Sequence, residues 1–265
     1  MTLLTVQGLN KSFGGVKAIT DVDLRFEAGK VHSVIGPNGA GKTSLINMLS
    51  GIYRPDTGSI ALQGQELAGQ PAHRFAAAGI GRTFQNLQVF FNMTALENVM
   101  TGRHLRESCS LAAALLRTPA LQRAEADSRQ AARELLRLVG LCGQEDTRAD
   151  TMAYGALKRL EIARALAAQP RLLLLDEPAA GLNATEAREI DVLIQRLAQG
   201  GTTVVLVEHN MALVMEVSDH IVVLNHGRKL AEGTPQQVSV NADVIEAYLG
   251  KAEPEDYAEA EVAHA

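Results

Sequence analysis

The stretch GPNGAGKTS at residues 36–44 constrains this chain more than any other feature. It fits the pattern G-x-x-x-x-G-K-[ST]. An apolar run at residues 31–35 precedes it and predicts a buried strand, and residues 44–49 follow with helical character. A strand, a glycine-rich turn and a helix form a phosphate cradle, because backbone N–H groups and the positive end of the helix dipole point into one small volume. The alternative is a chance match in a surface loop, which the flanking strand and helix disfavour.

Each residue type in this stretch has an expected task. The glycines let the chain curl without a clashing Cβ, Lys42 reaches the β- and γ-phosphates, and Thr43 holds Mg²⁺. The residues expected to bind the nucleotide here are Gly36, Pro37, Asn38, Gly39, Ala40, Gly41, Lys42, Thr43 and Ser44.

Length and charge limit the classes of protein that fit. The 265 residues suffice for one large α/β domain or two small ones. Lys and Arg number 25 against 30 Asp and Glu, a net charge of −5 that disfavours a general nucleic-acid binder. Aromatic residues are 4% and Trp is absent, which argues against base-stacking platforms. We therefore expect no nucleic-acid partner.

The chain also lacks signals for export or for crossing a membrane. Cys109 and Cys142 are far apart and have no second pair to complete a zinc site, so two reduced thiols in a cytosolic protein are favoured. The first residues show neither a basic start nor a long apolar run, so no signal peptide is predicted. The apolar runs at residues 111–116 and 172–175 are far shorter than the ~20 residues that span a bilayer. Any membrane role is expected to depend on a partner.

The first half of the chain changes from strands to helices. Residues 2–35 alternate as strands do, with Val22, Leu24 and Phe26 on one face. A turn signal at residues 54–58 leads into a short strand at 59–62. Residues 94–140 are expected to be mainly helical, with Glu125 placed to pair with Arg129. The arginines of this segment, expected on a solvated face, are Arg123, Arg129, Arg133 and Arg137.

Strands and helices alternate in the second half. Fully apolar runs at residues 171–175, 203–207 and 221–224 are typical of strands in a sheet that is covered on both faces. Helical patterns between them predict right-handed βαβ crossovers. Residues 251–265 hold five acids and one base, which predicts a disordered tail. We find no internal repeat.

Two acids follow the run of four leucines. Asp176 and Glu177 would stand at the carboxyl end of a strand, where open α/β sheets bind ligands. We expect Asp176 to hold Mg²⁺ through its water shell and Glu177 to orient or deprotonate the attacking water. The alternative is a pair of acids kept for solubility, which is costly beside a core.

Three more residues carry weaker signals. Gln85 could touch the metal and the water, although a loop glutamine is usually structural. His209 follows an apolar strand and could hydrogen-bond the γ-phosphate, or be a satisfied structural histidine. Phe13, beside two glycines, could offer adenine an aromatic face, or belong to the core.

Taken in order, these motifs resemble an ABC-transporter ATPase from residue 1 to about 250. The resemblance runs through GPNGAGKTS, Gln85, Tyr154-Gly155, LLLLDEP, Ala180-Gly181-Leu182-Asn183 and His209. It implies an α/β P-loop NTPase fold with a mainly parallel core sheet, an N-terminal antiparallel β subdomain and an inserted α-helical subdomain at about residues 86–165. It also implies ATP and Mg²⁺ as ligands and coupling of ATP hydrolysis to transport.

Longer segments read MAYGALKRLEIARAL, LDEPAAGLN, VEHNMALVMEVSDHIVVLNHGRKLAEGTP and NADVIEAYLG. They are similar to one branch, the ATP-binding subunits of high-affinity branched-chain amino acid importers. The segment between Gln85 and Tyr154, including RTPALQRAEA, is similar to the larger of that system's two ATPases. The branch implies three kinds of partner: a second ATPase subunit in a hetero- or homodimer, two permease subunits and, indirectly, a periplasmic binding protein. It implies that this chain lies at the cytoplasmic face of the bacterial inner membrane, attached through the permease subunits. It implies that Ala153, Tyr154 and Gly155, which we call the signature residues, act on nucleotide held by the other ATPase chain. Contacts between the two chains are implied at Gly181, Leu182 and Asn183.

The signature departs from the usual Leu-Ser-Gly-Gly-Gln. It reads Met152-Ala-Tyr-Gly-Ala156, so the serine hydroxyl and the glutamine are both missing. Gly155 and the N–H groups of a helix expected at residues 156–168 remain as donors. We therefore expect the composite site that uses this signature to be the weaker of two. Residues 87–91 are predicted to form part of a docking groove for a permease helix, with a core location for Phe90 and Phe91 as the alternative.

Other functions fit less of the pattern. An importer of urea or another small solute would use the same machine, because such ATPases do not touch the cargo. A soluble ABC ATPase of repair or translation typically has two nucleotide domains in one chain, long coiled coils or basic surfaces. A P-loop kinase would not explain Tyr154-Gly155, Asn183 and His209 in this order.

Overall fold

The computed structural model describes residues 1–105 and 119–249. The predicted acidic tail at residues 251–265, Cys109 and the apolar run at 111–116 lie outside these ranges. Cys142 is described, and it is an exposed free thiol.

An antiparallel sheet is built from the N-terminal residues, in the strand order β2-β1-β4-β5. Its strands are β1 (Thr2–Phe13), β2 (Val16–Glu27), β4 (Thr57–Leu62) and β5 (Gln65–Glu66). The predicted alternation in β2 is confirmed, because Val22, Leu24 and Phe26 are buried while the residues between them are exposed. This period-2 pattern gives the sheet one apolar face. That face packs on the helix that follows the predicted phosphate loop, which is our name for residues 36–44.

The second sheet has the order β10-β9-β3-β8-β7-β6. Its strands are β3 (Val31–Ile35), β6 (Ile80–Arg82), β7 (Leu172–Asp176), β8 (Thr203–Val207), β9 (His220–Asn225) and β10 (Arg228–Gly233). Neighbouring strands are parallel except for β10, which pairs antiparallel with β9. The strands predicted from apolar runs are confirmed, and every residue of β3, β7 and β8 is buried because helices cover both faces.

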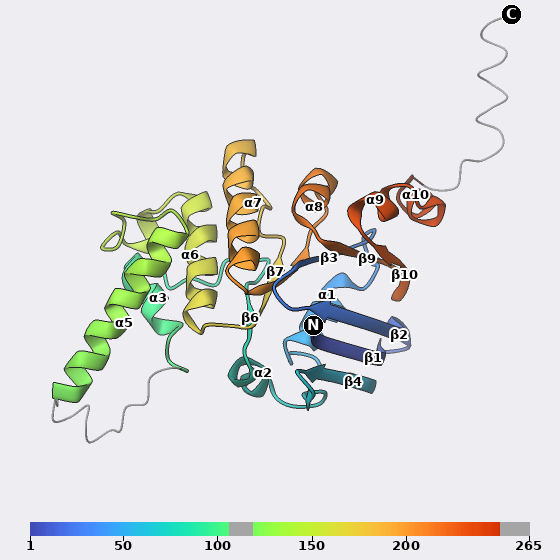
Figure 1. Ribbon diagram of the computed structural model, residues 1–265, viewed down its shortest axis with the longest axis horizontal. Helices are drawn as coiled ribbons and strands as arrows, with labels where there is room; N and C mark the ends of the chain where they lie inside the picture. The colour runs from blue at the N-terminus through green and yellow to red at the C-terminus, as the bar shows by residue number, and fades with distance from the viewer. Residues whose placement is uncertain (106–118, 250–265) are drawn as a thin grey trace, which may run out of the picture.

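Helices fill three places around the sheets (Figure 1). Between the two sheets lies α1 (Lys42–Leu49), which contributes Leu45, Ile46, Met48 and Leu49 to a shared core. The helices at the far side or edges of the parallel sheet are α2 (Ala72–Ala78), α7 (Ala184–Gln199), α8 (Met211–Val217), α9 (Pro235–Ser239) and α10 (Ala242–Leu249).

The remaining helices gather at one end of the molecule, on the left of Figure 1. They are α3 (Ala95–Thr101), α5 (Pro119–Leu138), the 3₁₀ turn η1 (Ala149–Thr151) and α6 (Tyr154–Ala167). Their grouping agrees with a helical unit inserted at about residues 86–165, whose status as a subdomain stays a prediction. On α5, Arg129 pairs with Glu125 at 2.8 Å, and its four arginines are exposed, as expected.

The start of α6 differs from the expectation. The helix begins at Tyr154, two residues earlier than the predicted residue 156, so that Gly155 lies inside its first turn. No helix in the described part of the chain is long and apolar enough to span a membrane.

Candidate nucleotide site

The phosphate loop is seated tightly on neighbouring backbone. Gly36 has φ 150° and Gly41 has φ 102°, which are conformations that side chains rarely allow. A Cβ on Gly36 would overlap the carbonyl oxygen of Leu224, and one on Gly41 would come within 2.6 Å of the carbonyl oxygen of Ala18. Glycine is therefore required here by space as well as by backbone angle, and Gly41 leads directly into α1.

Lys42 folds back over this loop. Its Nζ donates to the carbonyl oxygens of Gly36 at 2.6 Å and Pro37 at 3.1 Å. Burial lowers the pKa of Lys42, and the Glu177 and Asp176 carboxylates oppose that change. The cation therefore lies in the field of both acids. Thr43 in the first turn of α1 is exposed, and Ser44 is half-buried.

Asp176 ends β7 in a buried position next to a cation. Its Oδ2 lies 3.1 Å from Nη2 of Arg82, and the two side chains are 6% and 8% exposed. Burial raises the pKa of Asp176, Arg82 opposes the rise, and the charge of Glu177 adds to it. The second oxygen of the carboxylate is thus the one left for a further ligand.

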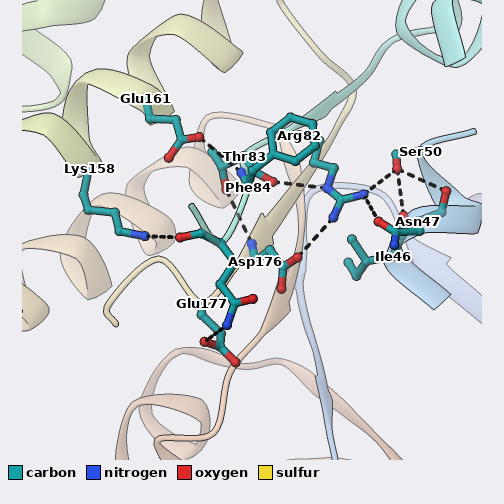
Figure 2. A network of polar contacts seen from close by, with 11 residues as sticks. Ile46, Asn47, Ser50, Arg82, Thr83, Phe84, Lys158, Glu161, Asp176 and Glu177 are labelled. Atoms are coloured by element: carbon teal, nitrogen blue, oxygen red, sulfur yellow. Dashed lines mark hydrogen bonds and ion pairs between the residues drawn. The ribbon is translucent and has the colours of Figure 1, made fainter. Parts of the chain in front are cut away.

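Arg82 uses its whole guanidinium group to join three elements (Figure 2). Nη1 donates to Asn47 Oδ1 on α1 at 2.6 Å and to Oγ of Ser50, the C-cap of that helix, at 2.8 Å. Nε donates to the Thr83 carbonyl at 3.2 Å. Sequence reasoning missed this residue. Its only sequence signal is a charge at the end of a short apolar segment, three positions before Gln85.

Glu177 meets Gln85 and His209 beside this ion pair. Gln85 Nε2 donates to Glu177 Oε2 at 3.0 Å, and His209 Nδ1 lies 3.7 Å from Oε1. The backbone of Glu177 has φ 49°, a strained value for this residue type that turns the chain sharply after β7. The structure therefore brings together three predicted residues from separate segments, and leaves Oε1 able to accept a hydrogen bond from water.

His209 is held by its own neighbour. The buried Glu208 accepts the His209 N–H and the Ala179 N–H, each at 3.1 Å. These bonds connect the chain after β8 to the chain after β7. The side chain of His209 is itself mostly exposed, at 66%.

The signature residues and the predicted dimer contacts lie side by side. Gly181 stands next to the exposed Tyr154 ring, and a Cβ on Gly155 would come 2.5 Å from Glu186 Oε1. Asn183 caps α7 by accepting the N–H groups of Thr185 and Glu186 at 3.0 Å each. Within the described ranges, no hydrogen bond or ion pair joins the signature residues to the phosphate loop.

The three phenylalanines for which a core location was the alternative are all exposed, so that alternative is wrong for each of them. Phe13 is 42% exposed and packs edge-on against Tyr53, with 5.2 Å between ring centroids. Phe90 and Phe91 are 44% and 47% exposed. The adenine-binding role of Phe13 and the docking role of residues 87–91 stay predictions.

The backbone that presents Phe90 is fixed by a buried amide. Asn98, fully buried on α3, accepts the Phe90 N–H at 2.8 Å and donates to the Phe90 carbonyl at 3.0 Å. The two bonds satisfy both backbone groups of Phe90, as pairing with a neighbouring strand would. Its ring lies over Arg164, with the guanidinium carbon 5.5 Å from the ring centroid.

Comparisons with known proteins agree with this geometry. A family model described as ABC transporter matches residues 19–180, and one described as branched-chain amino acid ATP-binding cassette transporter matches residues 228–254. The chain is 47% identical to the high-affinity branched-chain amino acid transport ATP-binding protein BraF of Pseudomonas aeruginosa, across 94% of this chain and 98% of that protein. It is 45% identical to LivG of Escherichia coli, described in the same words, with the same coverage.

Solved structures show the same fold. A nucleotide-free ATP-binding cassette from an ABC transporter superposes with a TM-score of 0.82 at 29% identity, covering 95% of this chain and all of that one. An ATP-binding cassette in its ADP conformation gives a TM-score of 0.81 at 29% identity, with the same coverage.

Proposed function

The chain belongs to the ABC transporter family of ATP-binding proteins, and we propose that it powers an importer of branched-chain amino acids by hydrolysing ATP. Membership supports nucleotide binding and ATPase activity. The cargo assignment is supported by the names of the relatives and by the match of the C-terminal residues 228–254. The observation that carries the proposal is the meeting of Gln85, Glu177 and His209 beside Asp176 and the phosphate loop.

In this mechanism the phosphates lie against the loop at residues 36–44, where Lys42 exchanges its loop carbonyls for β- and γ-phosphate oxygens. Phe13 offers its exposed ring to the adenine. Glu177 Oε1 accepts a hydrogen bond from the attacking water and takes its proton as the new oxygen–γ-phosphorus bond forms. The bond from the γ-phosphorus to the bridging oxygen breaks, and ADP leaves with the electron pair on that oxygen. Gln85 fixes the other Glu177 oxygen, and His209 donates to the γ-phosphate.

The donor groups around the phosphates suit Mg²⁺. The Thr43 hydroxyl, the Asp176 carboxylate and the Gln85 amide oxygen are all hard oxygen donors. Among the described residues no cluster of three His, Cys, Asp or Glu could hold a metal alone. This is expected for an ion that keeps waters and shares its shell with substrate phosphates. When bound, Mg²⁺ neutralises charge on the transferred group.

The partners follow from the same proposal. A second ATPase subunit contacts this chain through Gly181, Leu182 and Asn183 and receives the signature residues opposite its own nucleotide. Two permease subunits carry the solute path at the bacterial inner membrane, and a periplasmic binding protein delivers the solute. The exposed rings of Phe90 and Phe91 form part of the surface that meets a permease helix.

The altered signature makes the two composite sites unequal. Ala156 is buried in the first turn of α6, and only Gly155 and backbone N–H groups remain as donors there. Loss of one such donor costs about 10²–10³ in rate. Glu177→Gln in this chain is therefore expected to lower ATPase turnover more than the same change in the partner ATPase. Equal rates for the two variants would refute the asymmetry.

The experiment that tests the function is uptake by the assembled transporter. The chain is co-expressed with its two permeases and second ATPase, reconstituted in liposomes with ATP inside, and supplied with binding protein loaded with leucine or with urea. Leucine uptake that stops in Glu177→Gln supports the proposal. Urea uptake in place of leucine uptake would overturn the cargo, and absence of ATP turnover in the assembled wild type would overturn the function.

A further inference from the structure

Two buried charged side chains of α6 hold the loop that carries Gln85 (Figure 2). Lys158 and Glu161 are one helical turn apart, and each is only 2% exposed. Lys158 Nζ donates to the Gln85 carbonyl at 3.2 Å. Glu161 Oε1 accepts the N–H of Phe84 at 3.2 Å and that of Gln88 at 3.3 Å. The loop is therefore bonded to α6 immediately before, at and after the catalytic glutamine.

Placing these two charges inside the protein is costly. Burial raises the pKa of Glu161, while the two loop N–H groups and the charge of Lys158 oppose the rise. Well-packed apolar side chains in such positions are often as stable as a buried ion pair, or more so. The pair is thus poorly explained by stability, and its partners point to another task, because all of its hydrogen bonds go to the backbone around Gln85.

The same helix begins at the signature residues. The Lys158 ammonium lies 5.8 Å from the centroid of the Tyr154 ring, one turn earlier on α6. Gln85 in turn donates to Glu177. A continuous path of contacts therefore leads from the signature of this chain to its own catalytic carboxylate, through Lys158 and Gln85.

The start of the loop is bonded to a different part of the molecule. Arg82 and Thr83 are bonded to Asp176 and to α1, which belong to the phosphate-binding part of the molecule. Gln85 therefore lies two residues after Thr83, which is bonded to the phosphate-binding part of the molecule. The carbonyl of Gln85 is instead bonded to Lys158 on α6.

We propose that Lys158 and Glu161 are positioning residues that set the Gln85 amide against Glu177, because their side chains fix the backbone before, at and after Gln85. The proposal rests on the proposed ATPase function. Nucleotide binding itself does not depend on the pair, because no bond from either residue reaches the phosphate loop.

The test uses the assembled transporter in liposomes. Lys158→Met removes the hydrogen bond and the charge, Lys158→Arg keeps both, and Glu161→Gln keeps the shape with a neutral acceptor. All are combined with a Glu→Gln change at the corresponding catalytic glutamate of the partner ATPase, so that turnover reports on this chain's site. Lys30 and Glu134 are exposed, so Lys30→Met and Glu134→Gln are the controls matched to Lys158→Met and Glu161→Gln. We measure kcat and KM for ATP, the Kd of a fluorescent ATP analogue, and the unfolding temperature of each variant.

We expect Lys158→Met to lower kcat by about tenfold or more, since a small misplacement of a catalytic group has effects of this size. Kd should stay within about twofold, Lys158→Arg should restore most of the rate, and the controls should match wild type. In a Gln85→Ala background, Lys158→Met should cause little further loss, because the pair acts through that residue.

Three results would overturn the proposal: unchanged kcat in both Lys158→Met and Glu161→Gln, a full and independent loss in the Gln85→Ala background, or a rate loss matched by an equal loss of nucleotide affinity. If Lys158→Met unfolds, the decision passes to Lys158→Arg and Glu161→Gln with the same measurements. An inactive wild-type transporter would instead count against the proposed function, so the two failures are distinguishable.

Discussion

The buried pair of Arg82 and Asp176 should contribute strongly to stability, and Arg82→Met tests this. The variant keeps an unbranched side chain but leaves the Asp176 carboxylate, 6% exposed, without its cation. It also removes the donors to Asn47 and Ser50. Removal of one partner from a buried pair typically costs about 3–5 kcal/mol, because the remaining charge is uncompensated.

For a chain of this size, each kcal/mol corresponds to roughly 2–4 °C in the unfolding midpoint. The unfolding midpoint should therefore fall by about 6–20 °C. It is measured by circular dichroism on the purified chain near neutral pH without nucleotide. The double variant Arg82→Met/Asp176→Asn should regain a large part of the loss, since no lone carboxylate remains. Arg82→Lys should lie between wild type and Arg82→Met, because an ammonium supplies the charge but cannot reach all the acceptors.

Two outcomes would refute this reasoning. The first is a loss below about 1 kcal/mol in Arg82→Met, which is the range of an exposed ion pair. The second is a double variant that is less stable than Arg82→Met by the full cost of Asp176→Asn alone. Additivity of that kind would mean that the two side chains do not interact energetically.

Other predictions concern titration, space and docking. Burial lowers the pKa of His32 from 6.5 to about 4, so the folded state binds fewer protons than the unfolded chain between these values. The contribution of neutral His32 to the free energy of unfolding is fully present above pH 6.5 and is lost as the pH falls toward 4. For this reason the free energy of unfolding should fall by about 2–3 kcal/mol between pH 7 and 4.5. Urea unfolding should show a smaller fall over this pH range in His32→Gln. Burial and two neighbouring carboxylates raise the pKa of Asp191 to about 6, so stability is lost as the pH rises through 6. Asp191→Asn should therefore raise the free energy of unfolding at pH 8 by about 1–3 kcal/mol in the same assay. Gly36→Ala should weaken binding of a fluorescent ATP analogue at least about tenfold, because its Cβ overlaps the Leu224 carbonyl, and unchanged affinity would contradict the tight seating of the loop. Phe90→Asp with Phe91→Asp should prevent co-purification with the permeases while sparing nucleotide affinity, and retained assembly would place the docking surface elsewhere.

The sequence predicts the parts of the fold that depend on local pattern. The strands at β3, β7, β8 and β9 follow from short apolar runs, because only a sheet covered on both faces buries every residue of such a run. The phosphate loop follows from its glycines, whose spacing is tied to the path of the backbone. Asp176 and Glu177 follow from their place after four leucines.

The start of α6 could not be placed by local signals. Ala153 caps the helix without any side-chain bond, and Gly155 in the first turn reads as a helix breaker. The contact of Gly155 with Glu186 on α7 explains the glycine, and that contact joins residues far apart in the chain.

The polar network is also invisible to local pattern. Arg82, Lys158 and Glu161 look like ordinary charges on helices and loops, and charged side chains are usually solvated. Their burial depends on packing between segments more than 70 positions apart, as the bond from Lys158 to Gln85 shows. In the same way, hydropathy alone could not decide whether Phe13, Phe90 and Phe91 face the core or the solvent.

The buried amide of Asn98 has a consequence for the surface above it. With both backbone groups of Phe90 bonded, the ring is displayed on a scaffold that is already ordered before any partner arrives. For the docking proposed at this surface, little conformational freedom would remain to be lost, so association would be lock-and-key in kind. Replacing the buried Asn98 with Ala should therefore slow the proposed assembly by loosening the backbone of Phe90, although Asn98 itself is not exposed to a partner.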